Sequence, residues 1–261
     1  MPKKPTYQDL EKRVQELEEK IKDYKTTEEE IKSDFLSKMT HDLRTPMQGV
    51  LGYAKLGISR IDKVGKEKLL QYFNTIYDSS QRLVVLLNNM HELARLEAGI
   101  NEFCYSRTKL SDLVKSAIKE NLVLVGKKNL NINFKPPAFS DNIIVDIEKI
   151  AHLLKTLLSE SILYSPEHST IQIQISERNY NEIIFSINDQ GVNIPEEELS
   201  LVFEKFVQSN QTSTRANDSG LGFTICREII NAHNGKIWAE NNSKAETCYL
   251  FTVPLSEKPN S

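Results

Sequence analysis

Apolar residues in the first part of the chain recur with the spacing of a coiled coil. Between residues 8 and 38 they return every three or four positions, which is the heptad pattern. The seam consists of Leu10, Val14, Leu17, Ile21, Tyr24, Ile31 and Phe35. Glu28 interrupts this seam, and a solvated single helix is the alternative interpretation. The pattern predicts a coiled coil over residues 1–32.

The seam continues directly into two longer amphipathic helices. The first runs to about Ile61, and its apolar face comprises Leu36, Met39, Leu43, Met47, Val50 and Ala54. A turn around Gly65 precedes a second helix over about residues 67–97, which Gly99 is placed to end. One hairpin exposes too much apolar surface, so we expect two copies to pair into a four-helix bundle. This dimerisation domain is predicted to cover residues 33–100.

From Tyr105 onwards the pattern mixes strand and helix spacing. Strands are expected at residues 131–134, 143–145, 171–175, 183–187, 236–240 and 247–253. Helices are expected at residues 111–125, 147–164, 196–206 and 222–232. Because strands and helices do not strictly alternate, the pattern predicts a two-layer α/β sandwich over residues 105–257. The predicted fold class is therefore α + α/β, a helical hairpin followed by a sandwich.

Charge and cysteine content exclude several classes of protein. The net charge of −3 argues against a dedicated nucleic-acid binder, which would carry a basic face. The three cysteines are widely spaced, so neither a zinc site nor a disulfide framework is indicated. The N-terminus lacks the apolar core of a signal peptide, and the longest aliphatic run, residues 83–87, is too short to span a bilayer. We expect a cytoplasmic protein that does not insert into the membrane.

The sequence THDLRTP at residues 40–46 places a histidine in a chemically active setting. His41 lies about 160° around the helix from the apolar stripe and should face water. A neutral imidazole can attack a phosphoryl group, and the adjacent Asp42 could accept the other ring N–H and fix the tautomer. A lone exposed histidine is usually an ordinary surface residue, so the surrounding residues decide the interpretation.

Those residues resemble the H box of two-component histidine kinases. Residues 33–99, which close with HELARLEAG, are similar to the dimerisation and histidine-phosphotransfer domain of that family. The resemblance implies that His41 is the phosphoacceptor and that Asp42 assists proton removal. It also implies that Thr45 orients water when the same domain dephosphorylates a response regulator.

Two later segments have features of a nucleotide site. Asp189 and Gly191 follow a predicted strand, where a buried carboxylate could accept from an adenine amino group and a glycine would let the backbone approach the base. An ordinary turn uses the same residues. The sequence NDSGLGF opens a predicted helix, where backbone N–H groups could cradle phosphate.

With FEKF at residues 203–206, these segments resemble the G1, F and G2 boxes of the histidine kinase ATPase domain. The resemblance implies ATP as cofactor. It implies nucleotide contacts from Asp189, Gly191, Asn193, Lys205, Gly220, Leu221 and Gly222. The family usually has a second glycine where Asn193 stands.

Residues 156–166, TLLSESILYSP, resemble the N box of the same domain but depart from its pattern. The family usually has asparagine where Thr156 and Glu160 stand and a basic residue where Leu163 stands. The resemblance implies that Glu160 binds Mg²⁺ through a carboxylate oxygen and that Tyr164 lies in the nucleotide site. The added carboxylate and the missing cation predict weakened ATP binding. A plain amphipathic helix with an exposed glutamate is the alternative.

The sequence therefore favours a protein-histidine kinase that phosphorylates His41 from ATP and passes the phosphoryl group to a response-regulator aspartate. The expected partners are a second copy of the chain, a receiver domain and a separate sensor protein. The alternative, favoured by the altered N box, is a catalytically weak or inactive phosphotransfer or scaffold protein with a kinase-like fold.

Overall fold

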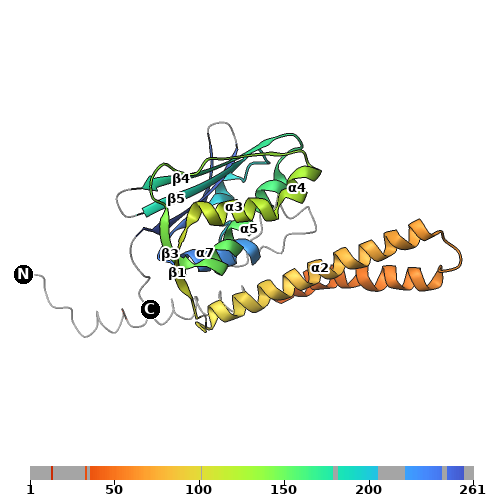
Figure 1. The fold of residues 1–261 in the computed structure, drawn as a ribbon. Coiled ribbons are helices and arrows are strands. Elements are labelled where there is room, and N and C mark those ends of the chain that lie inside the picture. Colours follow the sequence, from red (N-terminus) through yellow and green to blue (C-terminus); the bar gives the residue numbers. More distant parts are fainter. Residues whose placement is uncertain are drawn as a thin grey trace, which may run out of the picture. The chain divides into compact units, whose positions relative to one another are not determined.

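A computed structural model describes residues 13, 33, 36–100, 102–178, 182–204, 221–242 and 246–255. The chain divides into two compact units, Met1–Val84 and Val85–Ser261 (Figure 1). The boundary falls within α2, a helix over Lys66–Glu97. The predicted coiled coil over residues 1–32 lies outside the described residues, apart from Arg13.

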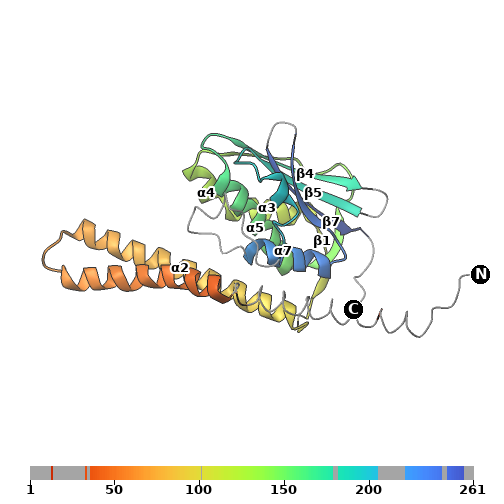
Figure 2. The same ribbon diagram turned by 180° about the vertical axis from the view of Figure 1, so that it is seen from behind.

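The first unit contains the predicted helical hairpin. A helix described over residues 36–59 is followed by a turn and then by α2, and both ribbon views show the two helices side by side (Figures 1 and 2). Gly49 permits a close approach, because a Cβ at this position would lie 2.7 Å from Ser79 Oγ. One turn further on, the rings of Tyr53 and Tyr72 lie 5.8 Å apart.

Large apolar side chains remain exposed on this hairpin. Leu51, Phe73 and Tyr77 each expose more than 60% of their surface. The other exposed apolar residues of the unit include Leu36, Met47, Ile58, Ile61, Leu70 and Val84. An exposed apolar surface of this extent marks an interaction site, as the prediction of paired hairpins requires.

The second unit is built on a mixed sheet. Its described strands are β2 (Asn131–Phe134), β4 (Thr170–Arg178), β5 (Glu182–Asp189), β7 (Thr247–Pro254) and β6 (Ile237–Asn241), which lie in that order across the sheet. The β2–β4 pair is parallel and the other pairs are antiparallel. A separate antiparallel pair joins β1 (Tyr105–Lys109) to β3 (Asn142–Asp146).

Helices cover one face of this sheet. Both views show α3 (Leu110–Glu120), α5 (Ile147–Tyr164) and α7 (Leu221–Ala232) on the same side (Figures 1 and 2). The short helices α4 (Leu122–Lys127) and α6 (Glu196–Leu199) also belong to this unit. Alternate residues of the strands point into the core, where the rings of Phe185 and Phe251 stack 4.8 Å apart. This two-layer arrangement confirms the predicted fold class.

Two details differ from the elements that the sequence predicts. The expected helix over residues 111–125 is divided at Asn121, whose side chain donates to the Ala117 carbonyl (2.9 Å) in competition with the helical ladder. The strand β1 was not predicted, because most of its residues are exposed and lack apolar alternation. Cys104, Cys226 and Cys248 are free thiols, and Cys226 and Cys248 are buried.

Candidate active site

The predicted phosphoacceptor side chain is open to solvent. His41 lies on the helix described over residues 36–59, and its side chain is 75% exposed. Its Nδ1 lies 3.5 Å from Asp42 Oδ1, at the upper limit of a hydrogen bond. One turn further on, the Thr45 hydroxyl donates to the His41 carbonyl at 3.4 Å. A large phosphoryl donor could therefore reach the imidazole without rearrangement of the helix.

At the end of β5 a carboxylate is buried. Asp189 is only 2% exposed, and its Oδ1 accepts a hydrogen bond from the Gly191 N–H at 2.9 Å. Burial raises the pKa of Asp189 to about 6, although hydrogen bonds from Gly191 and the Ser161 hydroxyl oppose the shift. The group is thus a hydrogen-bond acceptor in a site from which water is largely excluded.

The loop after Asp189 has room only for glycine at position 191. A Cβ on Gly191 would lie 2.7 Å from Asp189 Oδ1 and 3.0 Å from the Tyr164 carbonyl oxygen. Asn241 holds the next part of the loop by donating to the Ile194 carbonyl at 2.7 Å. Asn193 Oδ1 is buried without a hydrogen-bond partner among the described residues, which leaves an acceptor for a ligand.

Elements far apart in the sequence bring several of the predicted residues together. The Gly191 loop touches the C-terminal end of α5 at Tyr164, and a Cβ on Gly222 at the start of α7 would lie 3.0 Å from Thr156 Cγ2 on α5. Leu221 is buried at the first position of α7. Lys205 and Gly220, which were also predicted to contact the nucleotide, lie outside the described residues.

Comparison with known proteins decides the family. Residues 31–99 match the His Kinase A (phospho-acceptor) domain, and residues 145–257 match the Histidine kinase-, DNA gyrase B-, and HSP90-like ATPase domain. The sensor protein VanSC of Enterococcus gallinarum is 30% identical over 97% of this chain and 69% of its own length. The chain belongs to the sensor histidine kinases.

Other relatives of this histidine kinase are longer than the chain. The sensor protein KdpD of Clostridium acetobutylicum is 26% identical over 94% of the chain, which spans 27% of KdpD. The chain likewise spans 30% of the non-motile and phage-resistance protein of Caulobacter vibrioides, to which it is 26% identical.

Solved structures share its fold. Histidine kinase AdeS of Acinetobacter baumannii aligns with a TM-score of 0.66 and 22% identity, covering 83% of this chain and 98% of AdeS. Histidine kinase ThkA, in complex with the response regulator protein TrrA, aligns with a TM-score of 0.65 and 23% identity over 85% of this chain and 61% of that chain.

Glu160 is a carboxylate suited to a nucleotide-bound metal. Glu160 lies on α5, between the positions that touch Gly222 and Gly191, and its Oε2 is buried. Mg²⁺ is commonly held by one or two carboxylates together with substrate phosphates, so this residue fits a metal that arrives with ATP. No cluster of three or more metal-ligating side chains occurs within the described parts of the chain.

Lys128 lies near this site and was not predicted from the sequence. The Lys128 ammonium donates to the carbonyls of Ile162, Leu163 and Ser165, at 2.9, 2.6 and 2.9 Å. It therefore caps the C-terminal end of α5, where a cation is favourable to the helix dipole, and steadies the turn that touches Gly191. A lysine in a polar surface turn offers no sequence signal for this role.

No helix within the described ranges is long and apolar enough to cross a membrane.

Proposed function

We propose that this chain is an ATP-dependent protein histidine kinase. His41 accepts the γ-phosphoryl group of ATP and passes it to an aspartate on a separate response regulator. Two features of this histidine kinase chain support the proposal. His41 is exposed beside the Asp42 carboxylate, and Asp189 is buried beside a loop in which only glycine fits at position 191. The first is a nucleophile and the second can select adenine.

The proposed chemistry begins at the imidazole of His41. With Nδ1–H directed to Asp42, the Nε2 lone pair attacks the γ-phosphorus. An N–P bond forms, the bond from the γ-phosphorus to the bridging oxygen breaks, and ADP leaves. The Nδ1 proton then passes to Asp42, which neutralises the ring. Thr45, one turn away, would orient water in the opposing dephosphorylation of the response regulator.

The nucleotide in this proposal is held from three elements. Asp189 accepts from the adenine amino group, Gly191 and Asn193 line the loop beside the base, and Leu221 and Gly222 present backbone N–H groups at the start of α7. Glu160 and Tyr164 line the proposed site from α5. Lys205 and Gly220 belong to the proposed site on the resemblance alone. When bound, Mg²⁺ would neutralise phosphate charge beside Glu160.

The proposed partners are a second copy of this chain and a receiver domain. The uncovered apolar hairpin supports the homodimer. The complex of ThkA with a response regulator protein supports the receiver domain as partner. Use of ATP fits a cytoplasmic location. A separate sensor protein would supply the signal.

A labelling experiment tests the proposal. The purified chain is incubated with Mg²⁺ and ATP radiolabelled in the γ-phosphate, and the bound label is challenged with acid and with base. A phosphohistidine is labile in acid and stable in base. His41→Gln should abolish labelling, whereas His91→Gln, which alters another exposed histidine, should retain it.

Two results would contradict the proposal. Label that persists in His41→Gln would mean that another residue is the acceptor. A wild-type chain that neither binds Mg-ATP nor takes label would favour a phosphotransfer or scaffold protein, whose His41 is phosphorylated by a partner.

A further inference from the structure

The helices α5 and α7 are joined at the end opposite to the candidate nucleotide site. They run antiparallel, because Thr156 of α5 lies next to Gly222 of α7, while the residue before α5, Asp146, lies next to His233 after α7. Asp146 and Glu160 are separated by about 20 Å of helix at 1.5 Å per residue. Because helices are rigid, a shift at this joined end would also move the ends of α5 and α7 that face the nucleotide site.

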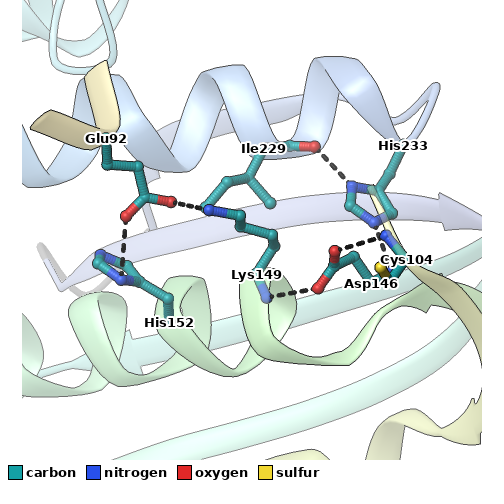
Figure 3. A network of polar contacts seen from close by, with 7 residues as sticks. All are labelled: Glu92, Cys104, Asp146, Lys149, His152, Ile229 and His233. Atoms are coloured by element: carbon teal, nitrogen blue, oxygen red, sulfur yellow. Dashed lines mark hydrogen bonds and ion pairs between the residues drawn. The ribbon is translucent and has the colours of Figure 1, made fainter. Parts of the chain in front are cut away.

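Asp146 is the centre of the joined end (Figure 3). Its Oδ1 caps α5 by accepting from the Lys149 N–H at 3.1 Å, and its Oδ2 accepts from the Cys104 N–H at 2.9 Å. Its own backbone N–H donates to His233 Nε2 at 2.9 Å. One buried residue thus connects α5, α7 and the segment that leads away from α2.

His233 fits this arrangement in one protonation state. It is 1% exposed, and its Nδ1–H donates to the Ile229 carbonyl at 2.7 Å while Nε2 accepts from Asp146. The ring must be neutral with the proton on Nδ1, because a second ring proton would face the Asp146 N–H. Burial lowers the pKa of His233, in agreement with that state.

The segment after α2 closes over the histidine. The Tyr105 hydroxyl donates to the Ala232 carbonyl at 2.9 Å, and the rings of Phe103 and Tyr105 meet the His233 ring edge-on at 5.6 and 5.3 Å. We call the set Cys104, Tyr105, Asp146 and His233 the linker clamp. It lies within the unit Val85–Ser261.

The last turns of α2 reach the same end of α5 by an ion pair. Figure 3 shows the Glu92 carboxylate between Lys149 and His152. Its Oε1 lies 2.8 Å from Lys149 Nζ, and its Oε2 lies 3.6 Å from His152 Nδ1. Lys149 is also the residue whose backbone N–H Asp146 caps. The end of α2 therefore contacts α5 through Glu92, and the segment after α2 contacts α7 through Tyr105.

We propose that Asp146, His233 and Tyr105 are positioning residues: the linker clamp sets how α5 and α7 lie against each other, and thereby the affinity of the nucleotide site at their far ends. The inference rests on the proposed function. It means that movement of the chain after α2 changes nucleotide affinity without contact with the nucleotide. By thermodynamic reciprocity, a bound nucleotide must also tighten the clamp.

The experiment compares two variants of the full chain that each remove the acceptor of one backbone N–H. His233→Phe keeps an aromatic ring but leaves the Asp146 N–H without its partner. Thr252→Val does the same to the Lys236 N–H, which donates to Thr252 Oγ1 at 3.1 Å outside the clamp. Tyr105→Phe is a milder clamp variant that loses only the hydroxyl. Melting temperature, the KM for ATP and phosphotransfer from phosphorylated His41 to a receiver domain are measured for each.

Both His233→Phe and Thr252→Val should lower the melting temperature, but only His233→Phe should raise the KM for ATP, by about tenfold or 1.4 kcal/mol. Tyr105→Phe should also raise the KM for ATP, but by less than His233→Phe does. Transfer from phosphorylated His41 should stay at the wild-type rate, because that step does not use nucleotide. In the wild type, a non-hydrolysable ATP analogue should slow amide hydrogen exchange at Cys104 and Asp146.

Equal KM values in the wild type and both clamp variants would overturn the clamp as a positioning device and leave it a purely structural feature. The proposal would also be overturned if the ATP analogue left amide hydrogen exchange at Cys104 and Asp146 unchanged. Failure of the proposed function looks different, because the wild type itself would then neither bind ATP nor take label.

Discussion

At the scale of single residues, burial gives identical side chains opposite roles. His41 and His233 are both histidines, yet one side chain is 75% exposed and the other residue is 1% exposed. The exposed ring has a nitrogen available for attack, whereas both nitrogens of the buried ring are engaged. Asp42 and Asp189 differ in degree, since the Asp42 side chain keeps 27% of its surface exposed, whereas Asp189 is only 2% exposed at a strand end.

The pKa of Asp189 predicts a pH-dependent affinity. Because burial raises this pKa to about 6, nucleotide binding should weaken as the pH falls through 6 and the carboxylate gains a proton. The contribution of Asp189 to folding stability changes with pH in the opposite direction. This contribution is fully present below the unfolded pKa of about 3.9 and is lost as the pH rises through 6. Asp189→Asn should weaken binding about tenfold, or 1.4 kcal/mol, and remove the transition near pH 6.

Calorimetric titration of ATP between pH 5 and 8 would measure both effects, with stability followed in parallel. A wild-type affinity that is flat across this range, or an Asp189→Asn affinity equal to that of the wild type, would show that Asp189 does not contact the base.

At the scale of elements, α5 links the core to the candidate chemistry. One side of the helix is buried through Leu153, Leu157 and Ile162. Thr156, Glu160 and Leu163 follow each other at helical spacing, and Thr156 touches the start of α7 at Gly222. Asp146 caps its first turn and Lys128 its last, so both ends of the helix are fixed.

Substitutions on α5 should strengthen the nucleotide site. Glu160→Asn with Leu163→Lys removes a negative charge and adds a cation near the phosphates. Unit charges about 4 Å apart interact by about 4 kcal/mol at an effective dielectric of 20, and Mg²⁺ offsets part of this. We expect the Kd for Mg-ATP to fall about tenfold, or 1.4 kcal/mol, with faster labelling of His41.

The control is Glu177→Asn with Leu122→Lys, which makes the same change of net charge at two exposed positions on β4 and α4. It should leave the affinity unchanged when both pairs are titrated at fixed Mg²⁺. If the α5 pair instead weakens binding, Glu160 is a working metal ligand and the site is not impaired.

At the scale of the whole molecule, the hairpin requires a partner. Leu70, Phe73 and Tyr77 follow each other at helical spacing on α2 and expose 59%, 63% and 64% of their surface. Burying one such side chain contributes about 2 kcal/mol, and a symmetric dimer would bury each of them twice. A homodimer through this surface would therefore be stable at micromolar concentration.

Light scattering of the wild type should accordingly give the mass of a dimer. Phe73→Glu should shift the protein towards monomer, because the charge would be buried in the bundle. Val123→Glu alters an equally exposed residue on α4 and should leave the mass unchanged. A monomeric wild type, or a dimer insensitive to Phe73→Glu, would mean that another surface or no surface pairs the chains.

Local patterns in the sequence were sufficient to predict most of the helices and strands and the exposure of His41. The helix expected at residues 147–164 is observed as Ile147–Tyr164, because its apolar spacing is a local signal. The hairpin and the exposure of His41 followed from the same periodicity. These features depend on neighbours three or four residues away, so the sequence by itself was sufficient.

The tertiary structure alone decided what depends on distant partners. The strand β1 exists because it pairs with β3, and Lys128 caps a helix that begins after it in the chain. The proximity of Asp146, His233 and Cys104 joins positions up to 129 residues apart. No local periodicity encodes such contacts, because they arise only when the helices pack on the sheet and the buried polar groups must find partners.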